Sequence, residues 1–121
     1  MIELITEGIR DNVVALRAHG TVEHEDYRRV IVPVMERKME SYPKIRVLYQ
    51  LGDDFTGYTA SALWDDAKLG GHHFHSFEKA AVVTEVEWIR KSVSFFRFLI
   101  PCPVRIFPNG ELHAAIDWIN S

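Results

Sequence analysis

The residues best suited to chemistry lie in the middle of the chain, between residues 51 and 84. Three histidines, His72, His73 and His75, follow a pair of glycines, and imidazoles are common ligands of zinc, copper and nickel. No further ligands at a defined spacing, as in His-Glu-x-x-His, accompany them. A solvated turn after a helix is therefore the favoured interpretation, and we expect no metal and no cofactor.

The acidic pair Asp53–Asp54 is a second candidate, because it follows a strand of the buried type. In open α/β sheets ligands bind at the carboxyl ends of strands, where paired carboxylates hold Mg²⁺ or share a proton. Aspartate is also a favoured turn residue, because its side chain hydrogen-bonds to nearby backbone. No Gly-rich phosphate loop is present. The pattern favours a turn over a carboxylate site.

Nucleophilic catalysis has little support in the sequence. Cys102 stands between two prolines at a predicted helix end, where the carbonyl dipoles raise the pKa of a thiol rather than lower it. The G-x-S-x-G nucleophile elbow does not occur. We therefore expect no catalytic residue and no enzymatic activity.

Composition narrows the class of protein. The chain has 121 residues, 47% of them hydrophobic and 26% charged, which is typical of one globular domain over residues 1–121. The formal net charge of −3 gives no electrostatic case for nucleic acid. No secretory signal and no stretch long enough to span a membrane is visible. We expect a cytoplasmic protein.

The elements alternate in a βα pattern. Period-2 and apolar runs predict strands, and the 3.6-residue period that starts at Tyr27 predicts a helix up to Tyr42. The prediction is an α/β fold with a five-stranded, mostly parallel sheet, an antiparallel edge strand and four helices. The strands are expected over 1–6, 13–16, 45–51, 79–84 and 104–107, and the other helices over 60–69, 85–100 and the residues after Asn109.

Local signals set the expected element boundaries. Pro33 is expected to kink the first helix without ending it, and Gly52 to Tyr58 to form a loop. Thr59 is expected to cap the second helix, with Leu63, Trp64 and Ala67 facing inward, and Gly70–Gly71 to break it. Thr84 and Glu87 predict a capping box for the third helix, and Asn109 a cap for the last, whose buried face holds Leu112, Ala115, Ile116 and Ile119.

The third helix carries more apolar surface than an ordinary surface helix. Its apolar arc spans roughly 160°, against about 100° for a typical amphipathic helix. Such an excess indicates deep packing for most of the arc, or an exposed docking surface. The arc comprises Trp88, Ile89, Val93, Phe95, Phe96, Leu99 and Ile100, and Phe98 lies outside it.

Scattered aromatic and apolar positions make the chain resemble the SpoIIAA-like family. These are Leu63–Asp66, Ala80–Val83, Trp88, Val104–Phe107 and Ala114–Ile119. The resemblance implies a relation to STAS domains, the anti-sigma-factor antagonists, and a likeness to the lipid-binding CRAL-TRIO fold. Antagonists of this type are switched by phosphorylation of a serine in an Asp-Ser-Ser-Gly-Leu motif. If Leu63 matches that leucine, Ser61 falls on the modified serine, Thr59 replaces the aspartate, and Ala60 and Ala62 replace the serine and the glycine.

Three functions follow from these observations, in decreasing order of preference. The first is a non-enzymatic STAS-like regulatory or protein-interaction domain, with Ser61 or Thr59 as the candidate phosphorylation site. The second is a small protein that binds a lipid or another hydrophobic molecule between the third helix and the sheet. The third is a hydrolase or metalloenzyme that uses Asp53, Asp54 and the histidines. Peripheral membrane contact and homo-oligomers are compatible with the first two. The expected binding residues are Phe55, Tyr58, Trp64, Trp88, Phe95, Phe96, Phe98 and Leu99.

Overall fold

The computed structural model describes residues 1–97 and 102–121, and for residues 63, 67, 70–74 and 96 the backbone only. The predicted α/β fold is confirmed. Five strands form one sheet in the order β1-β2-β3-β4-β5, in which β1 is antiparallel to β2 and the other pairs are parallel. The strands are β1 (Ile2–Leu4), β2 (Val13–Val22), β3 (Ile45–Tyr58), β4 (Phe77–Thr84) and β5 (Val104–Phe107).

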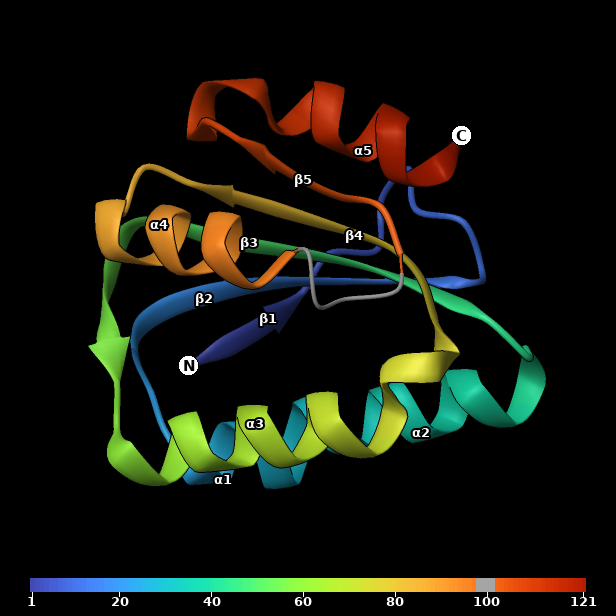
Figure 1. Cartoon of the computed structure of the whole chain (residues 1–121), viewed down its shortest axis with the longest axis horizontal. Helices are drawn as coiled ribbons and strands as arrows, with labels where there is room; N and C mark the ends of the chain where they lie inside the picture. Colours follow the sequence, from blue (N-terminus) through green and yellow to red (C-terminus); the bar gives the residue numbers. More distant parts are fainter. Residues whose placement is uncertain (98–101) are drawn as a thin grey trace.

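The helices lie on both faces of the sheet (Figure 1). The first helical segment comprises α1 (His24–Asp26), a π-helical turn (Tyr27–Ile31) and α2 (Val32–Ser41). It packs together with α3 (Ala60–His73) and α4 (Glu87–Phe96) over one face. The opposite face is covered over β3, β4 and β5 by α5 (Leu112–Asn120), whose Ala115 and Ile119 are fully buried, as predicted.

The first helical segment passes through Pro33, as predicted, and the structure shows how. A proline inside an α-helix removes one hydrogen bond and its ring clashes with the carbonyl four residues earlier. The five residues before Val32 adopt the wider π-helical turn, which changes the hydrogen-bonding register directly ahead of the proline. Tyr27 and Ile31 of this turn are both 1% exposed, so it is a packed part of the core.

Two predicted interruptions of regular structure are wrong. The expected loop from Gly52 to Tyr58 is a continuation of β3, because the longer β2 pairs with it as far as Tyr58. Asp53–Asp54 therefore lies in a strand and not in a turn. The expected break at Gly70–Gly71 does not occur either, since α3 continues to His73 and a 3₁₀ turn (Phe74–Ser76) follows. Two glycines cost a helix about 2 kcal/mol relative to alanine, and this cost does not end α3.

The predicted caps have mixed outcomes. Thr59 caps α3 as expected, with its hydroxyl accepting the Ala62 N–H at 3.1 Å. The capping box at Thr84 is wrong, because Thr84 is still paired with Leu51 in the sheet and α4 begins only at Glu87. The cap at Asn109 is also wrong, since its buried Oδ1 has no hydrogen-bond partner among the described residues.

Candidate binding surface

Three aromatic rings meet where β3 ends and α4 begins. The rings of Phe55 and Tyr58 are 5.4 Å apart at 65°, and those of Tyr58 and Trp88 are 6.4 Å apart at 76°. Both pairs have the edge-to-face arrangement that aromatic side chains prefer. We call Phe55, Tyr58 and Trp88 the aromatic cluster. It lies at the carboxyl ends of parallel strands, where ligands bind in open α/β sheets.

A bulge in β3 places Phe55 and Tyr58 on the same side of the sheet. Side chains three residues apart in a regular strand point to opposite faces. Here the register with β2 shifts between Gly20 and Thr21, which pair with Phe55 and Gly57, so β3 contains an extra residue. Gly57 has φ +144°, a conformation that only glycine adopts without strain. Both rings consequently pack on the core that α3 and α4 cover.

The helix α4 has one buried and one exposed apolar side. Ile89 is 7% exposed and Val93 packs against the core, whereas Trp88 is 50% and Phe95 is 73% exposed. Positions 88 and 95 are seven residues apart, which places them on the same face of a helix. The side chains of Phe96, Phe98 and Leu99 and the end of the predicted helix at Ile100 lie outside the described residues.

On α3 the prediction for Trp64 is wrong. Its side chain was expected to face inward, but it is 66% exposed, and Ala62 is the residue that is fully buried. A one-residue rise on a helix turns the side chain by about 100°, so the small Ala62 sits against the sheet and the bulky ring two positions later points outward. The expected inward positions of Leu63 and Ala67 lie outside the described side chains.

Tyr58 of the aromatic cluster also belongs to a group of three tyrosine hydroxyls and one carboxylate that influence one another. The Tyr27 hydroxyl donates to Asp66 Oδ1 at 2.8 Å. Desolvation by the surrounding protein raises the pKa of Asp66, and the hydrogen bond from Tyr27 opposes that shift. Burial also raises the pKa values of Tyr27, Tyr49 and Tyr58. The Tyr49 hydroxyl is buried near the hydroxyls of Tyr58 and Tyr27, without the geometry of a full hydrogen bond to either. The sequence offered no signal for this group, because its members come from three separate elements, the π-helical turn, β3 and α3.

The candidate phosphorylation residues lie at the start of α3. The Thr59 hydroxyl is engaged as the helix cap, whereas Ser61 is exposed. One turn later Asp65 is buried, and its Oδ2 lies 2.5 Å from Nδ1 of His24. Lys68 Nζ is 3.8 Å from the other Asp65 oxygen. The charge of Asp65 is therefore already paired with cationic or hydrogen-bonding partners.

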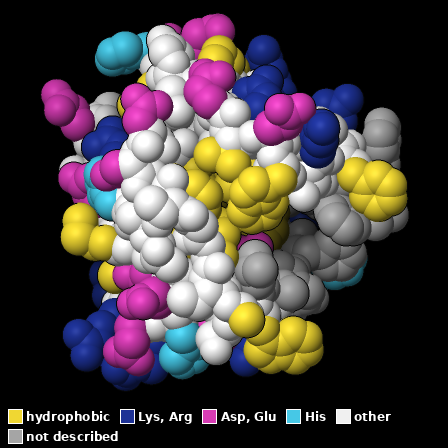
Figure 2. Space-filling model, turned by 90° about the vertical axis from the view of Figure 1, so that its left-hand side faces the viewer, with side chains coloured by type: hydrophobic (Ala, Val, Ile, Leu, Met, Phe, Trp, Pro, Cys, Tyr) yellow, Lys and Arg dark blue, Asp and Glu magenta, His cyan; other side chains and the backbone are white. Residues whose placement is uncertain are grey.

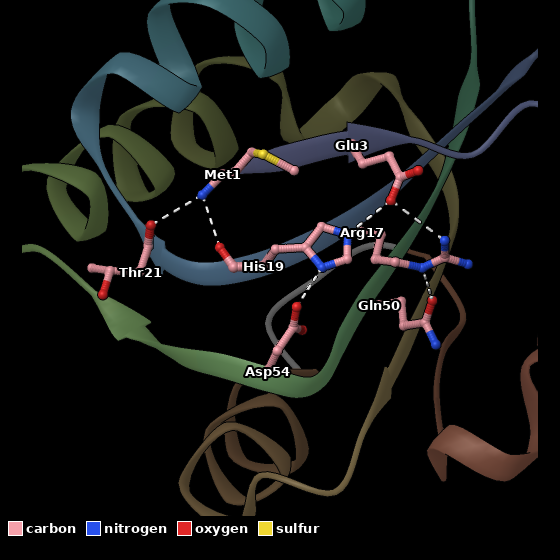
Figure 3. Close-up of polar contacts among 7 residues, drawn as sticks. All are labelled: Met1, Glu3, Arg17, His19, Thr21, Gln50 and Asp54. Carbon is pink, nitrogen blue, oxygen red and sulfur yellow. Dashed lines mark hydrogen bonds and ion pairs between the residues drawn. The ribbon is translucent and has the colours of Figure 1, made fainter.

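On the opposite face of the sheet, a cluster of ion pairs joins β1, β2 and β3 (Figure 3). Nδ1 of His19 is 2.6 Å from Asp54 Oδ2, and Nε2 is 2.8 Å from Glu3 Oε1. A carboxylate only accepts hydrogen bonds, so both contacts are hydrogen bonds only when both ring nitrogens carry protons. The bond to Glu3 and then the bond to Asp54 raise the pKa of His19. Arg17 extends the cluster by donating to Gln50 Oε1 at 2.7 Å.

This cluster accounts for one half of the acidic pair that the sequence singled out. Asp54 is held by His19, which also lowers its pKa, while Asp53 is exposed. Among the described residues, no group of three or more His, Cys, Asp and Glu side chains is placed to hold a metal ion. Burial raises the pKa of the free Cys102 thiol, in the predicted direction.

An open groove of about 930 Å³ runs between α4 and β5. Its lining is mixed in charge, with Lys91 Nζ 3.2 Å from Glu87 Oε1 across one turn of α4. The apolar contributions come from Phe95 and Ile106. The full lining is Glu85, Glu87, Arg90, Lys91, Ser94, Phe95 and Ile106. Four charged residues make this groove a poor match for an acyl chain. No described helix is long and apolar enough to cross a membrane.

Comparisons with known proteins agree with this architecture. No curated protein matches the sequence. A solved structure from Shewanella loihica PV-4, described as an uncharacterized protein from the DUF3478 family with a SpoIIAA-like fold, is similar at 26% identity and a TM-score of 0.79. The match covers 98% of this chain and 93% of the other. The model of the family described as SpoIIAA-like matches residues 13–120. The chain therefore belongs to the SpoIIAA-like family, as its sequence predicted.

Proposed function

We propose that this protein is a non-enzymatic interaction domain that binds a protein partner through the aromatic cluster and the exposed side of α4. The observation that carries the proposal is the position of Trp88 and Phe95. They stand 50% and 73% exposed on one side of a helix whose other side lies in the core. Aromatic anchors of this kind dominate the binding energy of protein interfaces. Membership of a family of regulatory STAS relatives supports the same kind of role. We place this role in the cytoplasm.

A photo-crosslinking experiment in the producing cells tests this proposal. Benzoylphenylalanine replaces Phe95 in one variant and Leu4 in a control variant, since Leu4 is also exposed, at 42%, but lies on the edge strand β1. We expect one discrete adduct from position 95 that is absent from position 4 and disappears when Trp88→Ser is added. Equal labelling from both positions would contradict the proposal. An adduct with a second copy of the chain would identify the partner as the protein itself.

Phosphorylation of Ser61 is the proposed regulation of this surface. Ser61 is exposed in the first turn of α3, where the helix dipole favours a phosphate. Thr59 is the weaker candidate, because its hydroxyl is engaged in the cap. Intact-mass analysis of protein from the producing cells tests the modification, and Ser61→Ala should remove it while Ser76→Ala leaves it unchanged. Persistence of the phosphate in the Ser61→Ala protein would reject this site.

Binding of a hydrophobic small molecule is the second candidate function. It is favoured by one observation: the surface is hollowed beside the hydrophobic side chains at the end of the molecule where β3 ends and α4 begins (Figure 2). Native mass spectrometry of gently purified protein tests it, because a bound lipid adds a defined mass. A spectrum of bare polypeptide, together with an adduct in the crosslinking experiment, would favour the protein partner.

A further inference from the structure

The end of β3 has a strand partner on one side only in the described part of the chain. The strand β4 pairs with β3 as far as Leu51, whereas β2 pairs with it as far as Tyr58. We call residues 52–58 the β3 extension. It carries Phe55 and Tyr58, which both belong to the aromatic cluster. The position of these rings relative to Trp88 of α4 therefore depends on how firmly β2 holds the β3 extension.

The backbone pairing of β2 with β3 is interrupted at His19. Regular pairing runs as far as Ala18 and resumes at Gly20, so His19 alone stands opposite residues 52–54 of β3. Three residues against one cannot all be paired, which disrupts the ladder where the β3 extension begins. A side-chain contact spans this interruption, since Nδ1 of His19 lies 2.6 Å from Oδ2 of Asp54 (Figure 3).

The His19 ring lies between two carboxylates. Its Nε2 atom is 2.8 Å from Oε1 of Glu3 on β1, while its Nδ1 atom contacts Asp54 on β3. Only the imidazolium, which has a proton on each nitrogen, donates to both carboxylates at once. The neutral ring has one proton, so one contact then sets a nitrogen lone pair against a carboxylate, and the other loses the positive charge that makes such bonds roughly twice as strong. The contact with Asp54 is therefore weaker after proton loss in either tautomer.

Charged groups from three strands surround this ring. Glu3 comes from β1, Asp54 from β3, and Arg17 of β2 lies 3.4 Å from Glu3 Oε1. The ammonium group of Met1 donates to the carbonyl oxygen of His19 at 2.8 Å. The hydrogen bonds to Glu3 and then to Asp54 raise the pKa of His19, and the same bonds lower the pKa values of both carboxyls. The ring consequently titrates above pH 6.5, while its two partners remain ionised down to pH 4.5.

We propose that His19 is a proton-dependent clamp that regulates the binding surface. The protonated ring holds the β3 extension against β2, and proton loss loosens the extension together with Phe55 and Tyr58. This inference rests on the proposed function and adds the regulation of its surface. A surface that is ordered before binding loses less conformational freedom when the partner docks. We therefore expect the partner to bind best between pH 4.5 and 6.5 and more weakly as the pH rises through the pKa of His19.

NMR spectroscopy of the full chain tests the clamp without a partner. The ring carbon signals of His19 report its proton, and the indole N–H signal of Trp88 reports the aromatic cluster. We expect the Trp88 signal to shift between about pH 5 and about pH 9 with the same midpoint as the His19 ring. Protection of the backbone amides of residues 55–58 against hydrogen exchange should fall about two- to tenfold over that range, as expected for the loss of one hydrogen bond. A Trp88 signal that does not follow His19 would overturn the inference.

Matched variants separate the contact with Asp54 from other effects of pH. Asp54→Asn keeps the shape of the side chain but removes its charge, so His19 should still titrate while the Trp88 signal no longer follows it. Glu3→Gln leaves the contact with Asp54 in place, so the Trp88 signal should still follow the ring, at a lower midpoint pH. The control Asp53→Asn removes the same charge from the neighbouring exposed residue and should leave the response of Trp88 unchanged. A Trp88 signal that follows His19 in Asp54→Asn would contradict the clamp.

The crosslink from position 95 connects the clamp with binding. In lysates of the producing cells, its yield should be about two- to tenfold lower at about pH 9 than at about pH 6, and His19→Gln should remove this difference. Equal yields at both pH values with His19 present would overturn the inference and leave the proposed function standing. A fall of the same size in His19→Gln would also overturn it, because the titrating group would then lie elsewhere.

The proposed function can fail separately from the clamp. If no crosslink forms at either pH although the Trp88 signal follows His19, the proposed function is wrong and the clamp remains a property of the fold. Circular dichroism and thermal unfolding show whether His19→Gln folds. Asp54→Asn, which changes only an exposed side chain, tests the same contact independently.

Discussion

Truncating Phe95 and Ile89 separates a docking face from a core face on the same helix. Phe95 is 73% exposed, so about a quarter of its surface is covered, and a quarter of the roughly 1.5–3 kcal/mol for complete burial is about 0.4–0.8 kcal/mol. Alanine has the higher helix propensity, which returns about 0.5 kcal/mol. Phe95→Ala should therefore change the free energy of unfolding by less than about 0.5 kcal/mol. Ile89 is 7% exposed, and Ile89→Ala should cost about 2–5 kcal/mol.

Urea denaturation monitored by far-ultraviolet circular dichroism measures both changes. The two variants share the helix, the replacement residue and nearly the same gain in propensity, so the difference between them reports burial. We expect the midpoint of Ile89→Ala to fall clearly while that of Phe95→Ala stays near the wild type, both with an unchanged slope. A loss of 2 kcal/mol or more for Phe95→Ala (the lower bound for a truncated core residue) would refute the reasoning, because Phe95 would then be a core residue.

Three further predictions concern the elements that hold the surface in place. Thr59→Ala should destabilise the protein by about 1 kcal/mol in urea denaturation through loss of the α3 cap, and Thr59→Ser should restore most of it. Gly57→Ala should cost about 1–3 kcal/mol in the same assay because of its φ of +144°, whereas Gly110→Ala, where φ is not positive, should be close to neutral. His19→Gln should lower the thermal midpoint most between pH 4.5 and 6.5. Because the pKa of His19 is raised, its contribution to stability is complete below pH 6.5 and is lost as the pH rises through the raised pKa. Because the pKa of Glu3 is lowered, the stability that Glu3 contributes fades below pH 4.5. A difference in thermal midpoint between the wild type and His19→Gln that grows steadily above pH 8 would contradict the stabilising role of the protonated His19 ring.

Most of the sheet could be predicted because its signals are local. The strands at 45–51, 79–84 and 104–107 are short apolar runs, and the helix after Tyr27 has a clear 3.6-residue period. The extension of β3 could not be predicted in this way. The segment from Gly52 to Tyr58 contains two glycines and two aspartates, which locally favour a turn. It is a strand because β2 reaches as far as Val22 and supplies the hydrogen bonds, a partner that no local pattern reveals.

The candidate site was predictable in its residue types and not in its geometry. Large aromatic residues are conspicuous in a sequence of this size, so the sequence suggested as binding residues Phe55, Tyr58, Trp88 and Phe95. The hydrogen bond between Tyr27 and Asp66 could not be predicted, because the two residues lie in helical segments far apart in the sequence. For the same reason the ion pairs of His19 leave no trace in the sequence, since Glu3 and Asp54 reach it from two other strands.

The strand β3 connects the ion pairs around His19 with the aromatic cluster. Asp54 and Phe55 are neighbours on β3 and therefore point to opposite faces. Asp54 is tied by His19 to β2 on one face, and Phe55 contributes to the aromatic cluster on the other. The pairing of Gly20 with Phe55 and of Val22 with Tyr58 joins the same stretch of β3 to β2 by backbone hydrogen bonds. The extension of β3 is thus held by backbone pairing within the sheet and by the contact between His19 and Asp54 on the face away from the aromatic cluster. Because the bulge lies between Phe55 and Gly57, breaking the contact between His19 and Asp54 and removing the positive φ of Gly57 are two separate ways to move Tyr58 relative to Trp88.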